Sequence, residues 1–206
     1  MSGIIAQNTL DNSGLIKSPA GGGAWNFIKK LTASASGDLS FVDGTDDVVF
    51  DDTYKEYLFT FKDIHPETDS ADFTFQVDTG TNTSYNQAMT TTFFWSAVKE
   101  DGTDSQLAYR GDLDQAQGTA FQQIQHDIGN DNDQSAAGTL HIFNPSSDTF
   151  VKHFYSDNHI YYKIDYSMRI FVAGYVNTTT ALTRVQFKMS TGNIDAGDIC
   201  LYGISS

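Results

Sequence analysis

Apolar and polar residues alternate along most of the chain after residue 24. The clearest run covers residues 54–62, where Tyr57, Phe59 and Phe61 fall on one side of an extended segment. A period of two is typical of a β-strand with one buried face. No stretch carries a convincing helical period. The pattern therefore predicts an all-β protein.

Runs of this kind recur along the chain, with glycine, asparagine and aspartate in the turns between them. We expect strands within residues 25–31, 39–42, 54–62, 73–77, 90–99, 107–109, 121–128, 138–143, 150–155, 160–175, 184–190 and 198–204. Many short strands at regular spacing favour an antiparallel β-sandwich. Their number suits a jelly roll, and a two-sheet sandwich of another topology is the alternative.

Two further expectations concern single segments. Val185, Phe187 and Met189 alternate with polar residues, and the glycine-containing loop 191–197 follows them. Such a loop favours a turn, so the last two strands are expected to pair as a hairpin. Residues 160–175 are rich in aromatic and β-branched side chains and are predicted to form one long or bulged strand.

The first 24 residues follow no period and contain several glycines. Ile4, Ile5, Leu15 and Ile16 form isolated apolar pairs that gain nothing in water. One interpretation is a loose terminus. The other is an extended N-terminal arm whose apolar pairs bind a groove on a neighbouring subunit or partner. The sequence thus divides into an arm over residues 1–24 and a single β-sandwich domain over residues 25–206.

Composition limits the kinds of partner. The chain has 206 residues, 12 basic and 26 acidic, and a formal net charge of -14. This charge repels phosphate backbones and anionic lipid surfaces, so we expect neither nucleic-acid nor membrane binding. No apolar run is long enough to span a bilayer, and no secretory leader is recognisable. We therefore expect a soluble protein.

Three histidines offer a candidate metal site. If residues 121–128 and 138–143 pair as a hairpin, His126 and His141 lie opposite each other, and His153 can lie beside His141. Three imidazoles on neighbouring strands could bind zinc. A slip of one residue would turn a histidine to the other face. The apolar neighbours favour core or interface histidines over a metal site.

The acidic loop after residue 126 offers a second candidate. Asp127, Asp131 and Asp133 could hold calcium through their carboxylate oxygens. The spacing fails the EF-hand pattern, because Ala136 stands where a glycine is required and Ile142 where a glutamate closes the site. A solvated acidic turn is the better interpretation. We expect no bound metal and no cofactor.

Motifs for catalysis are absent from the sequence. It has no Gly-x-Ser-x-Gly elbow, no phosphate-binding glycine loop before a helix and no His-Glu-x-x-His. The sequence therefore predicts no catalytic residues and a protein that is not an enzyme.

Several stretches together carry a family resemblance. They are SPAGGGAW at 18–25, FKDIHP at 61–66, IGNDNDQS at 128–135, FNPSS at 143–147 and MSTGNIDAGDICLYGI at 189–204. In this order they resemble a family of structural proteins from tailed phages of marine bacteria. The resemblance implies a virion component and supplies no catalytic residue.

The leading hypothesis is a capsid decoration or cement protein on the exterior of a phage particle. It would be a homotrimer that binds the major capsid protein or other virion proteins through its jelly roll and arm. One alternative is a receptor- or glycan-binding module of a tail fibre or spike. For this role Tyr161, Tyr162 and Tyr166 could offer aromatic faces to a sugar, although a core strand explains them as well. A neck or tail adaptor is the third possibility.

Overall fold

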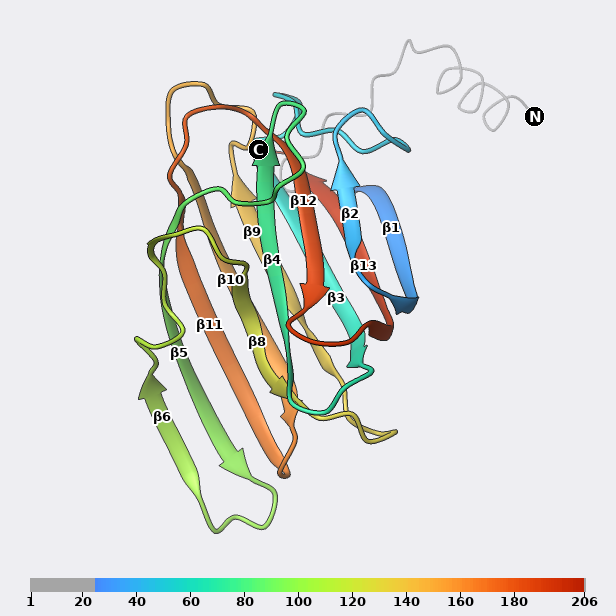
Figure 1. The fold of residues 1–206 in the computed structure, drawn as a ribbon, viewed down its shortest axis with the longest axis vertical. Coiled ribbons are helices and arrows are strands. Elements are labelled where there is room, and N and C mark those ends of the chain that lie inside the picture. The colour runs from blue at the N-terminus through green and yellow to red at the C-terminus, as the bar shows by residue number, and fades with distance from the viewer. Residues whose placement is uncertain (1–24, 206) are drawn as a thin grey trace, which may run out of the picture.

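The computed structural model describes residues 25–205, which form thirteen strands and no helix (Figure 1). No helix in this part of the chain could therefore span a membrane. The predicted arm, with Ile4, Ile5, Leu15 and Ile16, lies outside the described residues. The strands are β1 (Trp25–Ser36), β2 (Leu39–Val42), β3 (Glu56–Pro66), β4 (Ala71–Thr79), β5 (Met89–Lys99), β6 (Ser105–Tyr109), β7 (Ala116–Gly118), β8 (Gln122–Ile128), β9 (Ala136–Phe143), β10 (Lys152–Tyr162), β11 (Tyr166–Val176), β12 (Leu182–Met189) and β13 (Ile194–Ile204).

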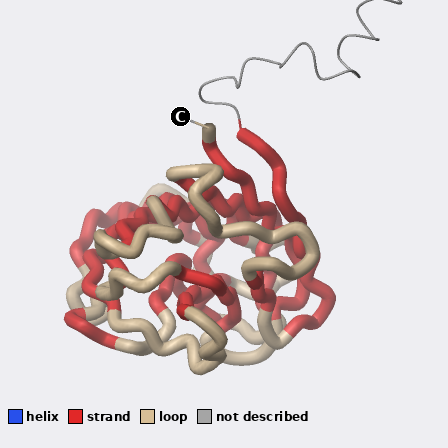
Figure 2. The backbone as a smooth tube through the Cα atoms, turned by 90° about the horizontal axis from the view of Figure 1, so that it is seen from above, coloured by secondary structure: helices blue, strands red, loops and turns tan. Residues whose placement is uncertain are grey.

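All strand pairs are antiparallel, and the prediction of an all-β antiparallel protein is confirmed. One run of strands, which we call the long layer, has the order β1-β13-β3-β9-β10-β11-β5-β6, and β7 also pairs with β5. A second run, the short layer, has the order β8-β4-β12-β2. A bridge between Ile128 and Tyr162 joins them into one sheet. Viewed from above, this sheet curls until it is nearly closed (Figure 2).

The core lies between the two layers and is rich in phenylalanine. Phe187 on β12 contacts Phe73 on β4 at a ring-centroid distance of 5.7 Å. It also meets Phe41 on the neighbouring β2 at 6.2 Å and, across the interior, Phe61 on β3 at 5.3 Å. Phe59 and Phe61 are buried together with Tyr57, as their alternation predicts. Burying one such side chain contributes about 1.5–3 kcal/mol, so the rings hold the layers together.

The predicted hairpin at the carboxyl end does not form. β12 pairs with β4 and β2, whereas β13 pairs with β1 and β3. The connection after Met189 therefore crosses from the short layer to the long layer. Gly192 in this connection has a φ of 66°, which glycine adopts at low cost. The expectation was wrong because alternation shows which face of a strand is buried and says nothing about its partner.

The single strand predicted over residues 160–175 is two strands. β10 and β11 pair along their whole length, from Lys152 opposite Val176 to Tyr162 opposite Tyr166. The turn is closed by a hydrogen bond from the Asp165 N–H to the carbonyl of Tyr162, at 3.0 Å. Asp165 adopts a φ of 65°, which aspartate tolerates better than most residues. This turn contains no glycine and lies between aromatic residues, so nothing in the sequence pattern indicated it.

Candidate functional site

The structure does not bring the three candidate zinc ligands together. β8, which carries His126, pairs with β4 and β10 and not with β9. His141 on β9 lies opposite Tyr155, and its Nδ1 is 2.5 Å from Glu56 Oε1. His153 lies opposite Tyr175 on β11.

The three candidate calcium ligands are separated as well. Asp127 contacts the side chains of Tyr162 and Lys163. The backbone N–H of Asp131 donates to Gln134 within its own turn. Asp133 lines a surface hollow with His65 and Asp195. Within residues 25–205, these aspartates share no cluster with metal-ligand spacing.

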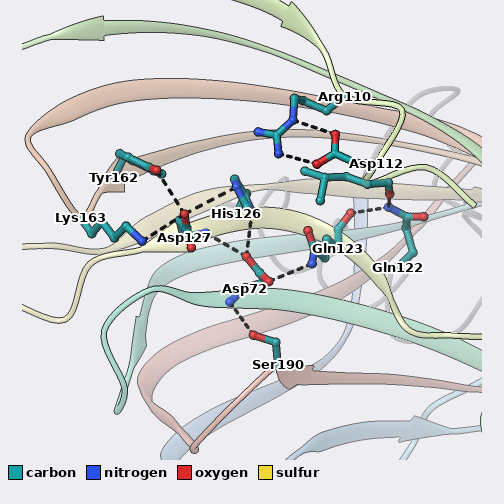
Figure 3. Close-up of polar contacts among 11 residues, drawn as sticks. Asp72, Arg110, Asp112, Gln122, Gln123, His126, Asp127, Tyr162, Lys163 and Ser190 are labelled. Atoms are coloured by element: carbon teal, nitrogen blue, oxygen red, sulfur yellow. Dashed lines mark hydrogen bonds and ion pairs between the residues drawn. The ribbon is translucent and has the colours of Figure 1, made fainter.

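His126 from the predicted zinc set and Asp127 from the predicted calcium set instead both contact Asp72, which the sequence did not single out. Asp72 at the start of β4 accepts hydrogen bonds through Oδ1 from His126 Nδ1 and from the Asp127 N–H, each at 2.9 Å (Figure 3). Its Oδ2 accepts from Gln123 Nε2 at 2.8 Å. The Asp72 N–H donates to Ser190 Oγ at 2.9 Å. The carboxylate is thereby fixed by residues of β8, and the Asp72 backbone by Ser190, which follows β12.

This cluster has the spacing of a metal site, but its ligand atoms already contact groups of the protein. Ligand atoms of Asp72, His126 and Asp127 all lie within 4.8 Å of one another. Both Asp72 oxygens already accept hydrogen bonds. Asp127 Oδ2 accepts from the Tyr162 hydroxyl at 3.1 Å and lies 3.3 Å from Lys163 Nζ. The lysine already supplies the positive charge that a metal ion would bring, so the arrangement fits an internal charge network better.

His126 is oriented as the base of a catalytic triad would be. Its Nδ1 faces the carboxylate of Asp72, as the base of a triad faces its orienting carboxylate. In the part of the chain that the structure describes, no hydroxyl or thiol hydrogen-bonds to Nε2, whose nearest charged neighbour is Asp127 Oδ2 at 3.6 Å. A nucleophile is therefore not in place. The Asp72 contact positions the imidazole against the rings of Phe93 and Trp95.

A small cavity lies beside this network, and we call it the aromatic pocket. Its volume is about 180 Å³, and it is lined by Trp95, Ala97, Gln106, Tyr162, Ile164, Tyr166 and Met168. The rings of Trp95 and Tyr162 lie 6.3 Å apart at 65°. Those of Tyr162 and Tyr166 lie 6.0 Å apart at 89°. The three rings therefore face in different directions around the cavity.

Strand pairing explains why the cavity is there. β8 joins the long layer only through the bridge between Ile128 and Tyr162, and among the described strands none of the short layer pairs with β5, β6 or β11, which lie to one side of it (Figure 1). The short layer thus leaves this end of the long layer uncovered. Ala97 lies opposite both Met168 and Gln106. Its small side chain leaves the space that larger neighbours enclose.

Carboxylates hold the pocket's tyrosine hydroxyl groups. Tyr166 donates to Asp104 Oδ2 at 2.8 Å, and Gln106 Nε2 donates to the same oxygen at 2.8 Å. This hydrogen bond raises the pKa of Tyr166. Burial, followed by the charge of Asp127, raises the pKa of Tyr162 to about 12. Both phenols consequently stay protonated and keep donating at neutral pH.

A second region with exposed rings lies on the surface of the long layer that faces away from the short layer. We call it the outer face. Directly paired residues point to the same side of a sheet. The pairs Phe27–Tyr202, His141–Tyr155, Phe171–Phe94 and Phe94–Tyr109 therefore lie on this side. Trp25, Phe27, Tyr109 and Leu107 are each more than half exposed, up to 79% for Leu107.

A groove of about 510 Å³ crosses the middle of the outer face. It is lined by Thr90, Thr91, Thr92, Phe143, His153, Phe154, Tyr155, Ala173, Gly174 and Tyr175. Phe143 and Tyr155 are in ring contact at 5.9 Å. Gly174 allows close approach of β5, since a Cβ there would lie 2.4 Å from the Thr90 carbonyl oxygen. Small residues thus lie between aromatic ones.

No family model, no curated protein and no solved structure matches this chain. The resemblance to phage structural proteins therefore stays a prediction. Of the three tyrosines singled out for aromatic contacts, Tyr162 and Tyr166 line the aromatic pocket. Tyr161 points elsewhere, with its hydroxyl 3.4 Å from Asp165. Asp72 carried no signal, because 54 positions separate it from His126.

Proposed function

We propose that this protein is a non-enzymatic structural component of a phage virion, a capsid decoration or cement protein that binds through its outer face. One observation carries the proposal. Exposed apolar side chains occur along the outer face of the long layer, from Trp25 and Phe27 on β1 at one edge to Leu107 and Tyr109 on β6 at the other. A soluble monomer rarely leaves so many large apolar groups in water on one face.

The strength of such binding follows from the surface that it removes from water. Apolar area contributes about 25 cal/mol per Å² buried, before the costs of association. Phe94 and Phe171 stack at 5.2 Å and 15°, and His141 and Tyr155 at 4.4 Å and 12°. Rings already held by neighbours lose little rotational freedom on binding. The outer face is thus preorganised to form a large interface.

The partners that fit the proposal are the major capsid protein or other virion proteins, with a homotrimer as the assembly unit and the particle exterior as the location. Residues 1–24 would add apolar contacts across a subunit boundary. Many copies on a lattice stabilise a shell by mass action, because each copy binds only the assembled form.

The fold proposed for this role is a jelly-roll sandwich. Consecutive strands lie in opposite layers at eight places, for example β3 and β4, β8 and β9, and β12 and β13. Connections that cross repeatedly between two layers are typical of double-sheet jelly rolls.

The test uses phage particles that lack the protein and purified chain added back. The full chain should bind at hundreds of copies per particle, measured by gel densitometry and by image reconstruction. A double substitution, Leu107→Asp with Tyr109→Asp, should strongly reduce occupancy because charge enters the outer face. Deleting residues 1–24 should weaken it. Undiminished occupancy with the double variant, or only a few copies at the tail, would overturn the proposal.

A further inference from the structure

The aromatic pocket has the properties of a binding site for an organic cation. We propose that it binds a quaternary-ammonium group, a use that the proposed virion role does not require. Trp95, Tyr162 and Tyr166 line one cavity, and the Tyr162 ring stands at 65° to Trp95 and at 89° to Tyr166. Electron-rich ring faces attract cations, and quaternary ammonium groups are recognised by such sets of rings.

The charges around the pocket favour a positive ligand. Asp104 accepts hydrogen bonds from Tyr166 and Gln106. Within residues 25–205, no lysine, arginine or histidine nitrogen lies within ion-pair distance of Asp104. Its negative charge therefore lies at the Tyr166 hydroxyl without an ion-pair partner, and the nearby Lys99 is paired with Asp101 instead. The formal net charge of -14 also draws cations to the surface.

The chain's own cations already use two of these rings. The Arg110 guanidinium carbon lies 5.3 Å from the centre of the Trp95 ring, and Lys163 Nζ lies 5.9 Å from that of Tyr162. Each is neutralised by its own carboxylate, Arg110 by Asp112 and Lys163 by Asp127. Within residues 25–205, no cation lies over the Tyr166 ring, and the nearby Lys99 is likewise paired with its own carboxylate, Asp101, at 2.9 Å. Tyr166 and Asp104 therefore provide the attraction for a ligand.

Size and lining select among cations. A cavity of about 150 Å³ accepts benzene, so one of about 180 Å³ accepts a compact head group. Ala97, Ile164 and Met168 present apolar surface to methyl groups. A primary ammonium is strongly hydrated and would lose that water, whereas a quaternary ammonium has no N–H group to satisfy. A bare metal ion would find too few oxygen ligands.

The experiment compares two probes of the same shape and different charge. Choline and its uncharged carbon isostere, 3,3-dimethylbutan-1-ol, are titrated into the full chain at fixed ionic strength, with binding followed by calorimetry and by NMR. Choline should bind at least tenfold more tightly, which corresponds to about 1.4 kcal/mol. Methyl glucoside is the third arm, because a sugar could also contact aromatic rings.

Variants locate the site. Asp104→Asn keeps an oxygen acceptor for Tyr166 and removes the charge, and should weaken choline binding at least about threefold. Asp148→Asn makes the same charge change at an exposed position elsewhere and should leave choline binding unchanged. Trp95→Leu should abolish binding, with a thermal melt to confirm that this variant folds.

Three results would overturn the proposal. They are equal binding of choline and its isostere, tighter binding of the glucoside, and choline binding that Asp104→Asn leaves unchanged. None of them bears on particle occupancy, so the pocket and the virion role can fail separately.

Discussion

The outer face and the aromatic pocket are both built from aromatic residues, yet their rings are arranged differently. On the outer face the rings of Phe94 and Phe171 lie within 15° of parallel. In the pocket the rings of Tyr162 and Tyr166 stand at 89°. Parallel rings on a sheet make a flat surface suited to a macromolecule, whereas steeply angled rings enclose a small group. Orientation, more than composition, thus separates two kinds of recognition in one sheet.

The outer face and the aromatic pocket depend on the same core. The largest expected effect is therefore a core substitution that unfolds both. Phe187→Ala deletes the ring that contacts β2, β3 and β4. Truncating a buried phenylalanine costs about 3–5 kcal/mol. Urea unfolding should show this loss, with association and choline binding lost together. A stability change below about 1 kcal/mol would mean that the layers do not depend on this ring.

Substitution on the outer face should separate the regions. The double variant Leu107→Asp with Tyr109→Asp should lose association with phage particles, measured by gel densitometry, and retain choline binding. Exposed positions usually change stability by no more than about 0.5 kcal/mol, so the monomer should stay folded. If association persists, the contact surface lies elsewhere on the molecule.

A smaller effect is expected at the network that supports the pocket. Asp72→Asn replaces an acceptor of three hydrogen bonds with a side chain that has one acceptor oxygen. A buried donor that loses its partner costs about 1–3 kcal/mol. Chemical denaturation should show this loss, and the His126 ring resonances should shift. Outer-face association should be unaffected, and Asp148→Asn serves as the matched control.

The smallest effect concerns alkaline pH. The Tyr162 pKa is raised to about 12 in the folded state, above the ordinary value near 10. A raised pKa stabilises the folded protein below the unfolded value, and this contribution disappears as pH rises from 10 to 12. The stability of Tyr162→Phe should therefore depend less on pH in this interval. Phenolate absorbance should show one fewer late-titrating tyrosine, and an unchanged titration would contradict the assignment.

Alternation predicted the strands and their buried faces well. Tyr57, Phe59 and Phe61 point inward as expected, because the side-chain period of a strand is a local property. Pairing is a long-range property, and there the predictions failed. β12 and β13 enter different layers, and the turn at Asp165 is hidden between aromatic residues. The residues of these strands do not indicate which other strand each one pairs with.

The candidate sites show the same limit. Tyr162 and Tyr166 are close in the sequence and were predicted to offer aromatic faces, and both line the aromatic pocket. Trp95 and Asp104 join them through pairing of β5 with β11 and through the Tyr166 hydrogen bond. The histidine set depended on a β8–β9 pair that does not exist. Asp72 meets His126 only because β4 pairs with β8.

The position of β13 has a consequence for how the chain acquires its structure. Among the described strands, β1 pairs only with β13, although 177 positions separate contacts such as Asn26 with Gly203. During synthesis, β1 must wait with its hydrogen-bonding groups unpaired until residues 194–204 have left the ribosome. Contacts between such distant parts of a chain slow folding. Truncation within the last strand should accordingly release the first one to proteases, and nascent chains halted before residue 194 should be cleaved near residue 30.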